Sequence, residues 1–158
     1  MPMQINGTVL GESAMMALGA TLADHLSAGE HVFLKGPLGA GKTTLVRGFL
    51  RALGYQGTVN SPTYAMVETY ELAPYCCHHF DGYRIHDADE WLDMGIDDYV
   101  TPQAVCLIEW PESGQSVLPE PRLIIDITVP VTGQGREVRI QCSDTPMAGW
   151  KELEACLV

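Results

Sequence analysis

The stretch Gly36-Pro37-Leu38-Gly39-Ala40-Gly41-Lys42-Thr43 decides how this sequence folds. It follows the P-loop pattern of a glycine, four residues, a second glycine, a lysine and a threonine. Glycines let the backbone N–H groups of such a loop turn inward around phosphate oxygens, and the helix that follows adds positive partial charge at its start. The stretch predicts a nucleotide-binding site; the alternative is a glycine-rich turn that opens a helix by coincidence.

The residues on both sides of the loop favour the nucleotide site. Residues 31–35 read as a short buried strand, and apolar residues recur at helical spacing after the loop until Gly54, which suits a left-handed helix cap. This strand–loop–helix order is the context in which the pattern binds phosphate. We therefore expect Lys42 to reach the β and γ phosphates and the Thr43 hydroxyl to bind Mg²⁺.

ATP is preferred over GTP by elimination. The sequence contains neither the Asn-Lys-x-Asp motif that reads guanine nor an Asp-x-x-Gly switch motif. The expected nucleotide contacts follow the loop and the first turn of its helix: Gly36, Leu38, Gly39, Ala40, Gly41, Lys42, Thr43 and Thr44.

The remaining residues predict alternating helices and strands with short turns and no internal repeat. The predicted elements are helices over 13–28 and near 89–94, strands over 63–72, 76–81, 104–109, 122–129 and 137–142, and a last helix after Thr145-Pro146 whose apolar side is Trp150, Leu153 and Leu157. The apolar strand over 104–109 is expected to be central and buried on both faces. We predict one α/β P-loop NTPase domain over residues 1–158, with a mixed, mostly parallel central sheet flanked by helices and an antiparallel C-terminal hairpin.

Composition narrows the function classes. The chain has 158 residues, 46% of them hydrophobic, and its formal net charge of -11 argues against a surface that grips DNA or RNA alone, because phosphate binding needs clustered Lys and Arg. Any RNA would be held by a partner protein. The start lacks signal-peptide features, no apolar run approaches membrane-spanning length, and the five cysteines do not suggest a secreted disulfide framework. We expect a cytoplasmic protein without membrane association.

Glu109 ends the strand predicted over 104–109, where P-loop enzymes place an acidic residue that holds Mg²⁺ directly or through water. The alternative is a strand-end carboxylate that faces water, and the presence of the P-loop favours the metal role. Trp110 follows and is expected beside the nucleotide, where it would stack, cover the site or receive a partner. Core packing is the alternative for this aromatic side chain.

Asp81 is the candidate for orienting the attacking water or holding the water shell of the metal. Arg84 would either pair with it or meet phosphate; the alternative is a strand end with a surface ion pair between the two. Ser61-Pro62-Thr63-Tyr64 would approach the γ-phosphate as a switch with hydroxyl ligands, or form an ordinary turn. The candidate catalytic residues are Asp81, Lys42 and Thr63.

Two other clusters offer less specific signals. Cys76-Cys77-His78-His79 lacks the spacing of a zinc site, and consecutive residues of a strand point to opposite faces, so we reject zinc. The acidic cluster within residues 87–98 is either a docking surface for a basic partner or solvated helix surface.

Together these motifs resemble the bacterial TsaE (YjeE) family, the ATPases of tRNA threonylcarbamoyladenosine (t6A) biosynthesis. The matching segments appear in the family's order and span most of the chain: residues 38–44, 61–64, 79–81 with 83–84, 94–96, 108–111 and 135–137. The combination of these segments is more specific than any one of them.

The resemblance implies a protein that binds ATP and Mg²⁺ and works with the TsaD and TsaB proteins, which attach threonylcarbamoyl to tRNA. Contact with tRNA would then be indirect, through that complex. The resemblance implies that Thr43 and Glu109 are Mg²⁺ ligands and that Lys42 and the loop backbone bind phosphate. It also implies that Asp81 is needed for hydrolysis.

Glu12 and Gly135 fall where the family lines the adenine. Three positions depart from the family's pattern. Met15 stands where a threonine is common near the base pocket, Pro37 where an acidic residue is common, and Gly82 where the side chain is bulkier. The first two departures leave the phosphate chemistry intact and bear on base contact and loop rigidity.

Three functions are compatible with these residues. The first is a partner-activated ATPase that resets a tRNA-modifying complex and turns over weakly alone. The second is a small-molecule kinase in which Asp81 activates a substrate hydroxyl, although no arginine-rich lid lies between Tyr99 and Glu137. The third is a non-catalytic interaction module that changes shape with bound nucleotide, through the possible switch at residues 61–64.

Overall fold

The structure is a computed structural model that describes residues 3–143 and 147–158. Its elements, in chain order, are β1 (Met3–Val9), α1 (Glu12–His25), β2 (His31–Lys35), α2 (Lys42–Ala52), β3 (Val67–Glu71), β4 (Cys76–Asp81), α3 (Ala88–Asp93), α4 (Ile96–Tyr99), β5 (Ala104–Glu109), the short 3₁₀ turn Glu112–Gly114, β6 (Leu123–Thr128), β7 (Arg136–Cys142) and α5 (Trp150–Ala155). Within these ranges no helix is long and apolar enough to cross a bilayer.

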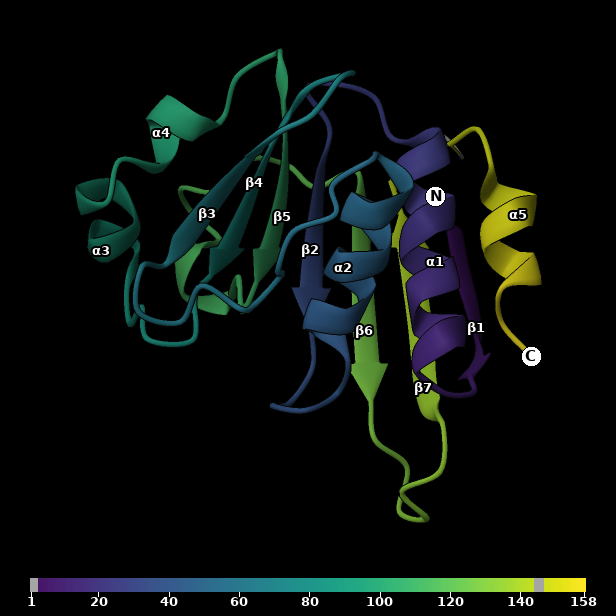
Figure 1. The fold of residues 1–158 in the computed structure, drawn as a ribbon. Coiled ribbons are helices and arrows are strands. Elements are labelled where there is room, and N and C mark those ends of the chain that lie inside the picture. Colours follow the sequence, from purple (N-terminus) through teal and green to yellow (C-terminus); the bar gives the residue numbers. More distant parts are fainter. Residues whose placement is uncertain (1–2, 144–146) are drawn as a thin grey trace.

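One seven-stranded mixed sheet runs through the molecule in the order β1-β7-β6-β2-β5-β4-β3 (Figure 1). The four inner strands β6, β2, β5 and β4 are parallel to one another, and β7, β1 and β3 are added antiparallel. The predicted α/β P-loop fold is confirmed, including the mostly parallel core and the β6–β7 hairpin. In such a sheet, ligands bind beyond the carboxyl ends of the parallel strands.

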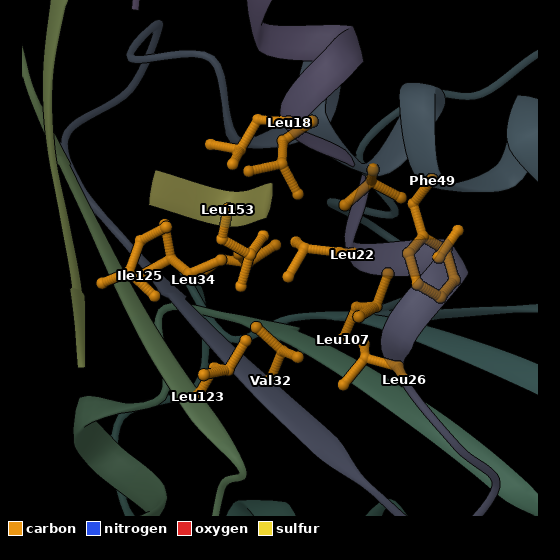
Figure 2. Packing of buried hydrophobic residues seen from close by; sticks show 14 of the residues in the cluster. Leu18, Leu22, Leu26, Val32, Leu34, Phe49, Leu107, Leu123, Ile125 and Leu153 are labelled. Carbon is orange, nitrogen blue, oxygen red and sulfur yellow. The ribbon is translucent and has the colours of Figure 1, made fainter. Parts of the chain in front are cut away.

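Helices α1, α2 and α5 cover one face of the sheet (Figure 1). Leu18 and Leu22 of α1, Phe49 of α2 and Leu153 of α5 are buried against strand residues such as Leu107 (Figure 2). Burial of aliphatic side chains on this scale is the main source of stability in a domain of this size. The buried side chains of α2 thereby anchor the helix that follows the phosphate loop in the core on this face of the sheet.

Glycines allow α1 and α2 to approach each other closely. A Cβ added at Gly19 of α1 would lie 2.0 Å from the backbone oxygen of Leu45, and one added at Gly48 of α2 would lie 2.1 Å from that of Met16. No side chain fits in either space, because real Cβ contacts do not come so close. The two glycines therefore set the distance between α2 and the neighbouring helix.

The opposite face carries a smaller apolar cluster beneath α3 and α4. Phe33, Phe80 and Ile108 from the sheet meet Trp91 of α3 and Ile96 of α4. Asp87 caps α3, since its side chain accepts a hydrogen bond from the Glu90 backbone at 2.9 Å. At least this member of the acidic cluster has a structural role, since it caps the start of α3.

Several predicted boundaries were wrong. The strand predicted over 63–72 begins only at Val67, because residues 63–66 form a turn that ends at Met66 with φ +68°. The helix predicted over 13–28 ends at His25, since the following Leu26 is extended. Both α4 and β1 were missed. Only Ile5 and Val9 of β1 are buried, which leaves a weak apolar alternation for sequence reasoning to detect.

The last helix is confirmed, with a different beginning. It starts at Trp150 after Gly149, whose φ of +87° is readily adopted by glycine. Leu153 is fully buried, and Trp150 and Leu157 pack on the core as predicted. The cap predicted at Thr145-Pro146 lies outside the described residues. Gly54, with φ +95°, has the left-handed conformation predicted after α2.

Candidate functional site

The P-loop lies between the end of β2 and the start of α2, as its sequence predicts. Three of its glycines have positive φ: Gly36 at +146°, Gly39 at +80° and Gly41 at +116°. Side chains rarely adopt these conformations, and a Cβ at Gly36 would also lie 2.3 Å from the Ile127 oxygen. The loop therefore has a fixed, glycine-dependent path that ends at the N-terminus of α2, where backbone N–H groups favour an anion.

Lys42, the first residue of α2, is buried with 5% of its surface exposed. Its Nζ donates hydrogen bonds to the backbone oxygens of Gly36 and of Pro37, the latter at 3.0 Å, and lies 4.5 Å from the centre of the Trp110 ring. Burial lowers the pKa of this amine, while the carboxylates of Glu109 and Asp81 act to raise it. The ammonium is thus held at the loop, where phosphate would meet it.

Thr43 and Glu109 meet at the expected metal position. The Thr43 hydroxyl lies 3.5 Å from Oε2 of Glu109, and the Glu109 side chain is buried. Glu109 reaches this place because β2 and β5 pair in parallel with Leu34 opposite Glu109, so both strands end at the same edge. A hydroxyl and a carboxylate oxygen next to a phosphate-binding loop suit Mg²⁺, which takes oxygen ligands and relies on phosphate for others. The residues present therefore fit the ion.

Asp81 ends β4 directly beside Glu109 in the strand register. Its Oδ2 accepts from the hydroxyls of Ser61 at 2.6 Å and Thr63 at 3.4 Å, and its Oδ1 accepts from the Tyr83 backbone at 2.9 Å. The structure thus places the Asp81 carboxylate against the segment 61–64, and the role of both at the γ-phosphate stays a prediction. The carboxylate is held by hydroxyls at the edge of the site and is nearly buried.

Arg84 lines the same hollow as Asp81, but no ion pair between the two forms among the described residues, and its contact with phosphate stays a prediction. Its guanidinium lies over the ring of Tyr64, 4.8 Å from the ring centre, and Tyr64 is 84% exposed. The Tyr83 backbone N–H, rather than the arginine, reaches the carboxylate of Asp81. The interpretation of these two residues as a surface ion pair is therefore wrong.

Trp110 lies at the mouth of the site. It has a φ of +55°, unusual for a bulky residue, and its ring centre lies 5.1 Å from that of Tyr83. Gly82 explains part of this arrangement, since a Cβ there would lie 2.3 Å from the Trp110 oxygen and 2.5 Å from the Trp91 ring. Glycine at position 82, where the resembling family has a bulkier residue, thus leaves room for the close packing of Trp91.

Two hollows meet along the P-loop. One, of about 470 Å³, is lined by Lys42, Thr43, Thr63, Asp81, Glu109 and Trp110, together with Leu38, Tyr83 and Arg84. The other, of about 370 Å³, is lined by Glu12, Met15, Gly135 and Arg136, among others. The backbone of residues 39–41 and Thr44 borders both. The phosphate-side and adenine-side residues named from sequence therefore sort into two adjoining compartments.

Glu12 and Met15 show how the second hollow is walled. Glu12 pairs with Arg47 at 2.9 Å on the exposed side. Met15 is buried, and its methyl group would lie 3.2 Å from a Cβ at Gly41. The methionine that departs from the family's pattern thus supports the P-loop from below.

Arg136 is a site residue to which sequence reasoning assigned no role. From the start of β7 its Nε donates to the Ala40 oxygen at 3.0 Å, and its Nη1 donates to the Gly135 oxygen at 2.7 Å. It therefore ties the β6–β7 hairpin to the P-loop. Its place beside Gly135 in the hairpin was the available signal, but the contact with Ala40 joins residues far apart in sequence.

His79 is the second residue that was quoted but given no role. Its Nε2 lies 2.5 Å from Oε2 of Glu109, and the ring is fully buried. The neighbouring His78 is partly exposed and meets Thr69 at 2.8 Å, while Cys76 approaches Glu71. The signal available in the sequence was strand alternation, which places His79 on the same face as Asp81.

Comparisons with known proteins match both the motifs and the fold. A family model described as threonylcarbamoyl adenosine biosynthesis protein TsaE matches residues 10–138. The chain is 46% identical over 121 residues to the tRNA threonylcarbamoyladenosine biosynthesis protein TsaE of Haemophilus influenzae, covering 73% of this chain and 77% of that protein. It is 36% identical over 124 residues to the Bacillus subtilis protein of the same name, covering 78% and 77%. The crystal structure of Bacillus subtilis YdiB is similar with a TM-score of 0.77 and 27% identity, covering 97% of this chain and 93% of that one.

Proposed function

The chain belongs to the TsaE family of threonylcarbamoyl adenosine biosynthesis proteins, and we propose that it acts there as a Mg²⁺-dependent ATPase activated by TsaD and TsaB. The observation that carries this proposal is the convergence of Lys42, Thr43, Asp81 and Glu109 on one hollow. Positioning and electrostatic stabilisation account for most of the catalysis in phosphoryl transfer, and these residues supply both.

Each residue has a role that follows from its contacts. The P-loop backbone and Lys42 bind the phosphates, and Lys42 offsets negative charge that develops on the γ-phosphate. Thr43 and Glu109 would hold Mg²⁺, which would supply positive charge beside the phosphates. Asp81 orients the attacking water, and the Ser61 and Thr63 hydroxyls fix its carboxylate.

The adjoining hollow takes the adenosine part of ATP. Glu12, Met15 and Gly135 line it, and it opens onto Gly41 and Thr44 of the P-loop. Its volume of about 370 Å³ falls within the usual range of small-molecule sites. The site thus accommodates a base on one side of the loop and phosphates on the other.

The partner requirement rests on charge and on the relatives. The similar proteins of Haemophilus influenzae and Bacillus subtilis are named for tRNA threonylcarbamoyladenosine biosynthesis. With a net charge of -11 this chain is poorly suited to grip tRNA alone. Its role is therefore to hydrolyse ATP within a cytoplasmic complex in which TsaD and TsaB handle the tRNA.

A nucleotide-dependent interaction module is the second candidate. The hydrogen bond from Ser61 to Asp81 favours this candidate. It links the loop that carries the exposed Tyr64 directly to the phosphate site. Bound nucleotide would then change the surface at Tyr64 without any need for hydrolysis.

The test is Mg²⁺-dependent ATP hydrolysis by the protein alone and with TsaD and TsaB of the same organism, with Lys42→Ala as the blank. The proposal predicts weak turnover alone and stimulation by the partners that disappears in Lys42→Ala. Tight ATP binding and partner binding without any turnover would support the interaction module instead. ADP release that depends on an added small hydroxyl compound would identify a kinase.

A further inference from the structure

His79 lies directly behind the Glu109 carboxylate. It is a fully buried histidine on β4, an inner strand of the sheet, and its Nε2 lies 2.5 Å from Oε2 of Glu109. The same Oε2 lies 3.5 Å from the Thr43 hydroxyl. One carboxylate oxygen therefore faces both the residue at the start of the P-loop helix and the histidine behind it.

The chemistry of the two groups assigns a direction to this hydrogen bond. A carboxylate oxygen is an acceptor, so we assign the proton to Nε2 and make His79 the donor. Nδ1 is buried and has no hydrogen-bond partner among the described residues. Burial of Nδ1 without a partner costs free energy, and the hydrogen bond from Nε2 to Glu109 is the polar interaction of this ring that offsets the cost.

The backbone of His79 is paired on both sides. His79 lies between Glu68 of β3 and Leu107 of β5 in the strand register, so a strand pairs with β4 on each side. Such a support suits a residue that must orient another, because metal-binding carboxylates are commonly fixed by hydrogen bonds from behind and lose metal affinity without them.

We propose that His79 is a positioning residue for Mg²⁺: its Nε2–H fixes the Glu109 carboxylate so that this carboxylate and the Thr43 hydroxyl bind the ion together. This inference rests on the proposed Mg²⁺·ATP function. A buried histidine that merely fills space would need the volume of the ring but not its N–H group, and this difference makes the two roles separable.

Two amide substitutions separate the positioning role of His79 from a space-filling role. The amide nitrogen of glutamine lies the same number of bonds from Cβ as Nε2 of histidine, so His79→Gln keeps a donor that reaches Glu109. The amide of asparagine is shorter and reaches only the place of Nδ1. His79→Leu removes the donor altogether while keeping apolar bulk. His78→Gln is the matched control, because His78 is the neighbouring histidine and its partner is Thr69.

The experiment measures calorimetric ADP binding across a Mg²⁺ titration, with binding in EDTA and thermal melting as checks on the loop and the fold. We expect His79→Asn and His79→Leu to raise the Mg²⁺ concentration that gives half of the maximal enhancement of ADP binding by about 10–100-fold. Binding in EDTA should stay unchanged, His79→Gln should recover most of the loss, and His78→Gln should behave as the parent.

Two results would overturn the inference. Equal Mg²⁺ dependence in the parent, His79→Asn and His79→Leu would show that Glu109 needs no support from the histidine. Equal shifts in all three His79 variants, glutamine included, would show a packing role only. Absence of Mg²⁺-dependent nucleotide binding in the parent would instead refute the proposed function, on which this inference rests.

Discussion

Asp81 and Glu109 are register partners at the ends of the parallel strands β4 and β5. One carboxylate accepts from the Ser61 and Thr63 hydroxyls, and the other lies between Thr43 and His79. The two adjacent carboxylates thus have different partners: Asp81 contacts the segment 61–64, and Glu109 contacts Thr43 of α2 and His79 of β4. Their different partners suggest separate roles, Asp81 in activating water and Glu109 in holding the metal.

Asp81→Asn should separate hydrolysis from binding. Asparagine keeps the shape and an acceptor oxygen for Ser61, but it loses the charge that orients and activates water. We expect partner-stimulated ATP hydrolysis to fall by about 10²–10⁴-fold, while calorimetric ADP affinity stays close to that of the parent. Asp97→Asn, at an exposed position of α4, is the control. Full hydrolysis by Asp81→Asn would exclude the role given to this residue.

Arg136→Met should weaken nucleotide binding without touching the phosphates directly. The Arg136 guanidinium donates hydrogen bonds to the backbone oxygens of Ala40 and Gly135, and these hydrogen bonds hold the P-loop to the hairpin. Hydrogen bonds that involve a charged group contribute about 1.5–3 kcal/mol, so we expect a loss of about tenfold or more in ADP affinity by calorimetry. Arg139→Met is the matched control, because Arg139 pairs with Asp126 elsewhere on the hairpin. Equal affinities in both variants would contradict the bracing role.

Gly48→Ala should destabilise the fold, although alanine is the better helix former. The added methyl group would lie 2.1 Å from the Met16 oxygen, so α1 and α2 must move apart. Overpacking of this kind costs about 1–3 kcal/mol, measured as a lower free energy of unfolding in urea. Ser13→Ala on the exposed side of α1 is the control. A gain in stability for Gly48→Ala would show that the helix pair has room to adjust.

His31 should make stability depend on pH in the acidic range. Burial lowers its pKa, and its Nδ1 accepts a hydrogen bond from the Cys106 backbone at 3.2 Å, which requires that nitrogen to be unprotonated. The unfolded chain therefore binds more protons than the folded one below about pH 6.5, so stability is present above that pH and is lost as pH falls. Burial also lowers the pKa of His78, which acts in the same direction.

The measurement is the free energy of unfolding at pH 7.5 and at pH 5.5 for the parent and for His31→Asn, whose amide oxygen replaces the Nδ1 acceptor. The variant should lose less stability between the two pH values than the parent. An unchanged pH dependence would assign the effect to other groups.

The sequence was sufficient for the parts of the site that lie in local motifs. The strand–loop–helix order around Lys42 and Thr43 predicted the P-loop, and the buried run ending at Glu109 predicted its neighbouring strand. These predictions succeeded because the chemistry of the motif fixes both spacing and backbone conformation over a few residues. The parallel pairing then followed from the α/β pattern.

Residues joined only by tertiary contacts could not be found in this way. Arg136, at the start of β7, reaches Ala40 in the loop after β2, and His79 reaches Glu109 from the neighbouring strand. The predicted pairing of Arg84 with Asp81 failed because the backbone turns after Asp81, so that the Tyr83 N–H reaches the carboxylate in its place. The segment 63–66 is a turn, because Met66 takes a positive φ that no propensity argument predicts.

The most direct test of the central claim is the t6A content of tRNA in a bacterium depleted of its own TsaE and supplied with this chain, measured by nucleoside mass spectrometry. The account predicts that the parent restores t6A and that Lys42→Ala and Asp81→Asn, expressed at the same level, do not. Restoration of t6A by both variants would contradict the claim that this protein supports tRNA modification by hydrolysing ATP at the site described above.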